Sequence, residues 1–404
     1  MKTTTKKIIF TSQICPALAT VALLWSASQP AWAATDTWTG FNGNTWANAN
    51  LTGGNSPPMN GDSLVFGSSG IGSLDDNLSG ALTTYGITFN SGAYNTGGYT
   101  LFNGPGCSIF LSGQASGNII GITNGSTGLQ TVNLNLNLDW GYYTFSDPAV
   151  SLALGGTLTL NSGGVLGTTV PNAGGVAFFD STGTISTSLA NDASGLISGL
   201  GGAGLMYNIS TGNPTGLATV SGGDIIAYPS ASYTVISSGS IGTGATKNIK
   251  FNTSGATGTY TASGAIVNTI TSIQAGTQTD TLTVTGTLTL GGTSGIGGIY
   301  ALNGTVNPSL LTVTGGTLTA GITSAGGTIV FGGNDSTQHN FAPNVATVAS
   351  SITDNSSSGK VAVVKVGVSS MSMSSSANTY SGGMYILQGQ IQAGSSWGSG
   401  PIYI

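Results

Sequence analysis

Aliphatic and polar residues alternate strictly in several segments of this chain, and this pattern restricts the fold more than any other feature of the sequence. In residues 132–138 valine and leucine alternate with asparagine, and in residues 281–290 leucine and valine alternate mainly with threonine. Shorter copies of the pattern occupy residues 156–160, 311–314 and 316–320. Because successive side chains of a β-strand point to opposite faces, each segment predicts a strand with one aliphatic face and one face of amides or hydroxyls.

The composition opposes helices. Glycine contributes 67 of the 404 residues, and only 5% of the residues are charged, against about 25% in an average globular protein. Every acidic residue is Asp and every basic residue is Lys, so Glu and Arg, which commonly fill helix surfaces, are missing. Gly-Gly, Asn-Gly and Ser-Gly steps between the alternating segments are typical of tight turns. No long stretch after residue 33 has helical periodicity, and we expect an all-β fold.

Repetition of one simple pattern favours a parallel β-helix, in which coils of roughly 20 to 25 residues stack on one another. Antiparallel sandwiches and barrels share the period of two, but the persistence of the pattern without any highly charged loop favours the repeat architecture. Thr and Asn suit the outer face, since equivalent side chains on stacked coils can hydrogen-bond to one another. The predicted domains are a signal peptide (1–33), an N-terminal cap with the first coils (34–110), a Gly/Thr/Ser-rich body (111–357) and a C-terminal repeat (358–404).

The N-terminus predicts export. Three lysines among the first seven residues precede an apolar stretch at residues 14–25, and Ala31-Trp32-Ala33 fits a cleavage site with small residues. The apolar stretch is too short to span a membrane, so a signal peptide is the favoured interpretation. After cleavage twelve aspartates and four lysines remain, a formal charge of −8. A chain of this charge without arginine has no basic face for nucleic acid.

Cys107 is the only cysteine beyond the predicted signal peptide, so no disulfide can form within the mature chain. We interpret it as a small buried apolar residue. The alternative is a reactive or intermolecular thiol, but no charged residue lies next to it in the sequence that would lower its pKa.

Two blocks near the ends of the chain combine Trp, Gly, Asn and Tyr in a recurring order. The N-terminal block comprises Trp38-Thr39-Gly40, Trp46, Pro57, Gly61-Asp62, Val65-Phe66, Leu74-Asp75 and residues 86–92. The C-terminal block comprises Lys365-Val366-Gly367, Ala377-Asn378-Thr379-Tyr380, Gly382-Gly383, residues 389–394 and Gly398-Ser399-Gly400. These residues resemble the secreted bacterial proteins with autotransporter-associated β-strand repeats. The departures from that pattern are Asn50-Leu51 for the usual Asn-Trp, and Ser369, Met371, Met373, Ser375 and Met384 in the C-terminal block.

The resemblance implies a right-handed parallel β-helix of the pectin-lyase-like shape, carried to the outer membrane or cell surface, or released, as a passenger. Such proteins commonly end in an outer-membrane barrel or a sorting anchor, whereas this sequence ends at Ile404 without either pattern. An apolar, uncapped last coil is an aggregation hazard. We therefore expect a truncated product, the alternative being that a partner or further sequence covers Ile404.

Catalytic candidates are few. Asp75-Asp76 is the only adjacent carboxylate pair, but neighbouring residues of a strand point to opposite faces, and the resemblance implies a structural Asp at this point. Polygalacturonase-like hydrolases use aspartate clusters, and lyases of this fold use an arginine or lysine base with carboxylate-bound calcium. The mature chain has no arginine, and the lysines near Lys247 and Lys365 lie beside no Asp cluster.

The single histidine, His339, lies in a polar segment and is interpreted as a solvated loop residue rather than a triad base. One histidine and one cysteine cannot complete a zinc site. Calcium at turns that contain Asp, such as residues 222–224 and 332–335, is an alternative, although the tandem nonapeptide of calcium-binding β-rolls is absent.

Aromatic residues could form a strip that stacks on sugars; the candidates are Trp38, Trp46, Trp140, Tyr142, Tyr143 and Trp397. We favour Trp38 and Trp46 as a cover for the open end of the first coil, because large rings bury exposed aliphatic surface well.

We therefore assign no catalytic, cofactor-binding or metal-binding residue and expect no cofactor. The expected function is a non-enzymatic exported or cell-surface scaffold, acting as a spacer or adhesin and meeting glycans, cell-surface components or matrix. The alternatives are a hydrolase or lyase that acts on polysaccharides and a diffuse carbohydrate-binding surface. An enzyme would gather acidic residues in one groove, whereas a scaffold would scatter them among turns; the candidates for such a groove are Asp75, Asp139, Asp180 and Asp224.

Overall fold

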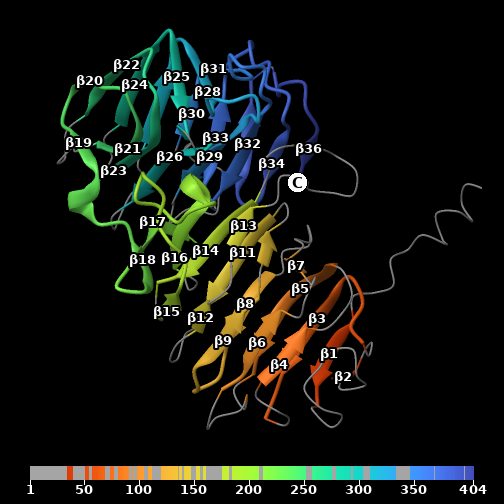
Figure 1. Cartoon of the computed structure of the whole chain (residues 1–404). Helices are drawn as coiled ribbons and strands as arrows, with labels where there is room; N and C mark the ends of the chain where they lie inside the picture. Colours follow the sequence, from red (N-terminus) through yellow and green to blue (C-terminus); the bar gives the residue numbers. More distant parts are fainter. Residues whose placement is uncertain are drawn as a thin grey trace, which may run out of the picture.

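A computed structural model provides the fold. It describes residues 34–39, 51–53, 57–68, 73–76, 81–90, 93, 98–103, 108–111, 120–134, 136–138, 141–146, 152–154, 158–160, 175–181, 184–208, 213–251, 257–274, 279–292, 294–303, 310–333, 346–367, 369–394 and 396–404. Within these ranges the elements are β-strands, apart from the 3₁₀ helices η1 (Gly201–Ala203) and η2 (Ser230–Ser232) (Figure 1). The predicted all-β class is confirmed. In the same ranges there is no apolar helix long enough to cross a bilayer.

The N-terminal part of the chain forms three rows of parallel strands. The first row contains β1 (Thr35–Trp38), β3 (Asp62–Phe66), the second half of β5 (Ala81–Phe89), β8 (Ile120–Asn124), β11 (Gly141–Ser146), β14 (Gly175–Asp180) and β16 (Gly204–Asn208). The second contains β4 (Ser73–Asp76), β6 (Thr100–Asn103), β9 (Gln130–Asn133), β12 (Leu152–Leu154) and β15 (Ile185–Thr187). The third contains the first half of β5, β7 (Ser108–Leu111), β10 (Leu136–Leu138) and β13 (Leu158–Leu160). From β3 to β15 the chain contributes to the first, the second and the third row in that order, and then begins again with the first.

Antiparallel strands interrupt this arrangement. β2 (Leu51–Thr52) pairs antiparallel with β1, and β16 is followed by β17 (Asn213–Ser221) and β18 (Asp224–Ala227) in an antiparallel meander. The turn between β17 and β18 is Gly222-Gly223, with φ of 64° and 88°. Two successive residues with positive φ are what a tight hairpin turn requires, and glycine adopts them without strain. Residues 222–224, considered above as an alternative calcium site, therefore belong to a hairpin turn.

The C-terminal part forms three parallel sheets. The eight-stranded sheet contains β19 (Thr234–Ile236), β21 (Gly244–Phe251), β23 (Val267–Gln274), β26 (Ile296–Asn303), β29 (Gly327–Gly333), β32 (Val361–Val366), β34 (Met384–Ile386) and β36 (Ile402–Tyr403). The seven-stranded sheet contains β20 (Gly239–Ile241), β22 (Thr259–Ser263), β24 (Thr279–Thr285), β27 (Leu310–Thr314), β30 (Ala346–Val348), β33 (Ser370–Met373) and β35 (Gln390–Ala393). The three-stranded sheet contains β25 (Thr287–Leu290), β28 (Thr317–Ala320) and β31 (Ser351–Ile352).

Successive strands of the eight-stranded sheet lie at unequal distances along the chain. Ile249 pairs with Ile270, 21 residues later, whereas Phe331 pairs with Lys365, 34 residues later. The expected period of roughly 20 to 25 residues is therefore too short for the longest repeats. The additional residues form loops and the strands of the three-stranded sheet, which is present only where the chain makes a longer excursion.

Two clusters of buried side chains make the core. One lies inside the C-terminal part, between its sheets; the other fills the N-terminal part and continues onto the outer side of the eight-stranded sheet. That outer side contributes Tyr300, Val330, Ala362, Val364 and Val366, all buried. Figure 1 shows the N-terminal strands, red to yellow-green, and the C-terminal strands, green to blue, as two stacks that meet in this region. The predicted body, residues 111–357, spans both.

Glycine permits the close approach of the two stacks. A Cβ on Gly202 would lie 2.9 Å from the carbonyl carbon of Gly297, and one on Gly201, whose φ is 50°, would lie 2.8 Å from the carbonyl oxygen of Ile296. The hydroxyl of Tyr300 donates a hydrogen bond to the carbonyl of Gly202. Burial raises the pKa of Tyr300 well above its usual value, so the hydroxyl stays protonated and able to donate.

Candidate functional site

A surface groove of about 540 Å³ lies over the three-stranded sheet. Five of its eleven lining residues carry hydroxyl groups; the lining residues are Gly264, Ile266, Thr287, Thr289, Thr319, Gly321, Ile322, Thr353, Asp354, Asn355 and Ser356. Threonines line it because alternate residues of β25 and β28 point away from the core, while Leu288 and Leu318 between them are fully buried. The groove is the best candidate for a binding site on this side of the molecule.

Asp354 is the one acidic or basic residue in the lining of this groove, and the chain itself occupies its carboxylate. Oδ1 accepts hydrogen bonds from the backbone amides of Val361 and Ser381, at 2.8 and 2.9 Å. Oδ2 accepts one from the Ser381 hydroxyl at 2.6 Å. Hydrogen bonds of this kind to a carboxylate fix the backbone around it. Asp354 thus ties together segments from successive passages of the chain.

Asn355, the next residue, has the same role. Its Nδ2 donates to the carbonyls of Ala320 and Thr323 at 3.3 and 2.8 Å, and its Oδ1 accepts from the amides of Ser357 and Gly359 at 3.0 and 2.8 Å. The side chain is buried, so these bonds satisfy polar groups that burial would otherwise leave without partners. The polar residues at this end of the groove therefore hold turns in place.

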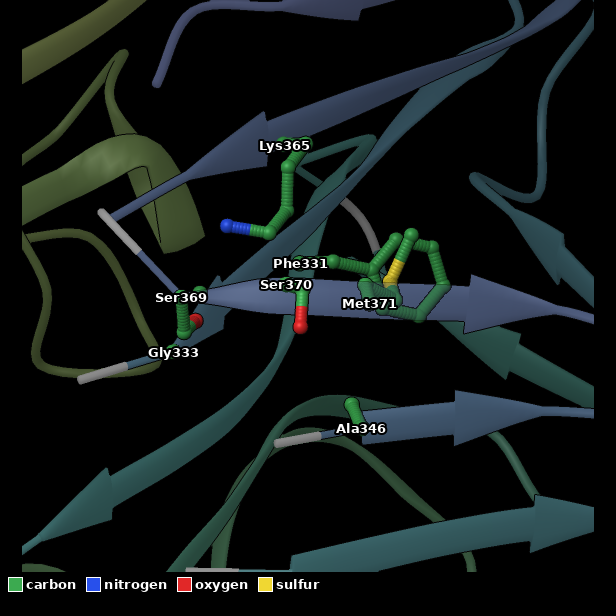
Figure 2. A pocket seen from close by; sticks show the side chains of 8 residues that line it. Phe331, Gly333, Ala346, Lys365, Ser369, Ser370 and Met371 are labelled. Atoms are coloured by element: carbon green, nitrogen blue, oxygen red, sulfur yellow. The ribbon is translucent and has the colours of Figure 1, made fainter. Parts of the chain in front are cut away.

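Lys365 lies on the inner side of the eight-stranded sheet, in a column of aliphatic and aromatic residues. The residues that occupy successive positions of this column are Ile249, Ile270, Ile299, Phe331, Lys365 and Ile386. Only 1% of Lys365 is exposed, and its side chain lines a cavity of about 10 Å³ with Ser369, Ser370 and Met371 (Figure 2). A cavity of that volume holds no more than about one water molecule.

The ammonium group of Lys365 is held by backbone carbonyls. Nζ donates to Val366 and Gly367 at 2.7 Å each and to Gln388 at 3.5 Å. Burial lowers the pKa of Lys365 to about 7, because desolvation penalises the charged form. All three acceptors belong to the backbone where two successive strands of the sheet end, so the lysine joins two turns. The sequence places Lys365 in a repeat motif and away from any Asp cluster, but it does not predict that the side chain is buried.

The structure separates Asp75 from Asp224, two of the four aspartates that an enzyme would gather. Asp75 in β4 and Asp224 in β18 belong to one row, with β6, β9, β12 and β15 between them, a separation of about 24 Å at about 4.8 Å per strand. Asp180 in β14 is buried, with 1% exposed, and Asp139 lies outside the described residues. None of Asp75, Asp180 and Asp224 lines the groove over the three-stranded sheet.

Several other predicted candidates lie outside the described residues: Trp46, Cys107, Trp140, His339 and the turn residues Asn334 and Asp335. Tyr142 and Tyr143 belong to β11, where the structure describes the backbone. Lys247 is half-buried in β21, with its stem packed against Gly244.

Two of the tryptophans considered for a sugar-stacking strip are packed against the core. Trp38 lies in the first strand with 1% exposed, and its ring meets Phe66 at 6.3 Å between centroids. Phe66 stacks on Phe89 at 5.3 Å, so equivalent positions of the first three parallel strands carry aromatic rings. Trp397 is half-buried against the C-terminal core. These rings build the interior, and a sugar-stacking strip made of Trp38 and Trp397 is not formed.

The roles that sequence reasoning missed are those of amides and acids that hold turns. Besides Asp354 and Asn355 they include Asn378, whose Oδ1 accepts from the amide of Ile352 and whose Nδ2 donates to Ser396, both at 2.8 Å. For Asp354 and Asn355 the usable signal was an Asp-Asn step followed by three serines and a glycine, which is the usual composition of side-chain-stabilised turns.

Within the described ranges, no three His, Cys, Asp or Glu side chains gather as metal ligands. Comparison of this chain with protein-family profiles, with curated proteins and with solved structures finds no match.

Proposed function

We propose that this chain is an exported, right-handed parallel β-helix that serves as a non-enzymatic surface scaffold, a spacer or the stem of an adhesin. The observation that carries the proposal is the use of its acidic side chains. Asp62, Asp192 and Asp354 each accept hydrogen bonds from nearby backbone amides. Carboxylates committed to the backbone hold turns, whereas a hydrolase needs at least two of them directed at one substrate.

The strand order supports the β-helix. In the C-terminal part the chain passes from the eight-stranded sheet to the seven-stranded sheet, then to the three-stranded sheet where it is present, and back again. Every strand pair within these sheets is parallel and joins strands of successive passages. A chain that repeats one circuit in one direction generates a stack of coils.

The residues of the block that resembles autotransporter-associated repeats stabilise this fold. Their structural roles support a relation to those scaffolds. Lys365 and Asn378 hold turns, and Tyr380 is fully buried. A Cβ on Gly382 would lie 2.5 Å from the carbonyl of Val361, and one on Gly400 would lie 2.4 Å from the amide nitrogen of Gly383. Such positions tolerate only glycine, so the motif is explained by stacking without reference to a ligand.

Export is supported by the surroundings of Ala34. Its backbone nitrogen lies 3.1 Å from Oδ1 of Asp62, a residue that is only 3% exposed. Cleavage after Ala33 would convert this nitrogen into an ammonium group beside a carboxylate, a stronger interaction than the amide makes.

The exported protein should therefore begin at Ala34, and Asp62→Asn should destabilise the processed form more than the unprocessed one. N-terminal sequencing of the exported protein, with urea unfolding of both forms, measures this; equal losses would contradict it.

The alternative is an enzyme or a diffuse binding surface for polysaccharides, and the groove over the three-stranded sheet is the observation that favours it. The test is incubation of the exported protein with neutral and acidic glycans, followed by assay of reducing ends and of unsaturated products. The scaffold proposal expects neither. Release of either product, lost in Asp354→Asn while the circular dichroism spectrum is kept, would replace the scaffold with an enzyme.

A further inference from the structure

The outer side of the seven-stranded sheet is a regular array of hydroxyl groups. In register across the strands, one column contains Thr259, Thr281, Thr312, Thr347 and Ser372, and the next contains Ser240, Thr261, Thr283 and Thr314. We call these nine residues the hydroxyl face. Three neighbouring strands, β22, β24 and β27, each carry two of its threonines with one buried residue between them.

The spacing of the array follows from strand geometry. Neighbouring strands lie about 4.8 Å apart, and alternate residues of one strand lie about 6.6 Å apart, so the threonines form a nearly rectangular lattice. No register shift interrupts the pairing from β20 to β35, whereas β21 and β23 of the eight-stranded sheet do shift register. The hydroxyl face is therefore a regular surface without interruption of its register.

The face is rigid. Threonine is branched at Cβ, which restricts χ1, and the members of the array at the centre of the sheet are half-buried against their neighbours. Beneath them lies a filled core that includes Leu282, Val284 and Val313, each no more than 2% exposed. Little side-chain entropy is therefore left to lose when a ligand is bound.

The face is also uncharged. In the strands of the seven-stranded sheet the one charged residue is Asp280, which is buried and accepts a hydrogen bond from the Ser272 hydroxyl at 2.6 Å. The one aromatic residue of these strands, Tyr260, is buried as well. A surface without charge offers little to a charged partner, and one without exposed rings lacks the platform on which sugars stack.

We propose that the hydroxyl face binds ice. Each threonine presents a methyl group, around which water orders, beside a hydroxyl that can hydrogen-bond to that water. Repeated at these two spacings on a rigid plane, such groups order a layer of water whose repeats are of the same order as those between oxygen atoms on the prism face of hexagonal ice. A second copy of the chain fits less well, because sheets that pack face to face bury interdigitating apolar side chains.

The exported protein should inhibit the growth and recrystallisation of ice, measured by nanolitre osmometry and by crystal size after annealing. Thr283→Tyr places a large ring at the centre of the array, suits a β-strand and should abolish most of the activity. Thr215→Tyr, at an exposed threonine of β17 outside the array, is the matched control and should retain it. Circular dichroism of both variants establishes that they fold.

A parent protein without effect on ice would overturn the proposal, as would an equal loss in Thr283→Tyr and Thr215→Tyr. Binding to crystalline cellulose or chitin that Thr283→Tyr removes, without any effect on ice, would assign the face to a polysaccharide instead. Concentration-dependent dimerisation lost in Thr283→Tyr, again without an effect on ice, would assign it to a second copy. None of these outcomes touches the scaffold proposal, which the glycan products test separately.

Discussion

The eight-stranded and seven-stranded sheets are built by alternate strands of the same chain, yet their outer sides differ. In β32 all six residues are buried, and in β29 all seven are. In β24 burial alternates from one residue to the next up to Val284. The eight-stranded sheet is covered by the N-terminal part of the molecule, and the seven-stranded sheet faces solvent.

The difference indicates that what covers the outer side of a sheet decides whether the outward residues of its strands are apolar or polar. Val364 and Val366 occupy outward positions in β32 and belong to the buried cluster that fills the N-terminal part, whereas Thr281 and Thr283 occupy outward positions in β24, which faces solvent. Strands buried on both sides are expected to be continuously apolar, and strands with one wet side are expected to alternate. Both kinds occur here within one repeat.

The largest expected effect comes from a charge on the covered side. Val364→Asp should lower the free energy of unfolding by about 3–5 kcal/mol, because it buries a carboxylate without a partner. The matched change on the solvent-exposed side of the seven-stranded sheet is Thr312→Asp. It should lower the free energy of unfolding by less than about 1 kcal/mol, the range of β-propensity. Urea unfolding of both variants measures the contrast, and equal losses would mean that the eight-stranded sheet is not covered.

A smaller effect is expected where glycine allows the two stacks to approach. Gly202→Ala should lower the free energy of unfolding by about 1–3 kcal/mol, since the new methyl group would overlap the backbone at Gly297. Gly216→Ala is the control, because a Cβ there meets nothing within 4 Å. Thermal and urea unfolding of both variants test the contact; a tolerated Gly202→Ala would contradict the close packing described here.

The last effect develops gradually with pH. The pKa of Lys365 in the folded chain, about 7, lies below its usual value of 10.5, so the unfolded chain binds this proton more tightly. Between these two values the free energy of unfolding should rise with pH, by up to about 1.4 kcal/mol per pH unit, and below pH 7 this contribution should be constant. Lys365→Met should remove the slope between pH 7 and 9, whereas Lys360→Met, at an exposed lysine, should keep it. Urea unfolding across this range measures the slope, and its persistence in Lys365→Met would assign it to another group.

The alternation in the sequence predicted the inward and outward residues of single strands well. Leu282, Val284 and Leu288 point into the core as expected, and Thr281 and Thr283 do not. The reason is that the two-residue period is local, so it needs no knowledge of the rest of the chain.

The docking of the two stacks could not be predicted in the same way. Gly201-Gly202 reads as another flexible turn, although its role is to lie against β26, which is distant in the sequence. The unbroken apolar run at Val361–Val366 was a usable signal of burial on both sides, except for Lys365, whose long side chain reaches backbone carbonyls instead of solvent. The roles of Asp354 and Asn355 in holding turns could not be predicted for a related reason. Their side chains hydrogen-bond to segments that only the fold brings together.

The contrast between the two sheets can be measured directly by the reactivity of cysteines placed on their outer sides. Ala362→Cys is a small change on the covered outer side of the eight-stranded sheet. Thr312→Cys is a small change on the solvent-exposed outer side of the seven-stranded sheet. Labelling of the folded protein with a thiol reagent, corrected for the parent protein, should modify Thr312→Cys at the rate of a solvent-exposed thiol and leave Ala362→Cys unmodified until urea unfolds the chain. Equal labelling rates in the folded state would contradict the covered eight-stranded sheet and the arrangement of the two stacks.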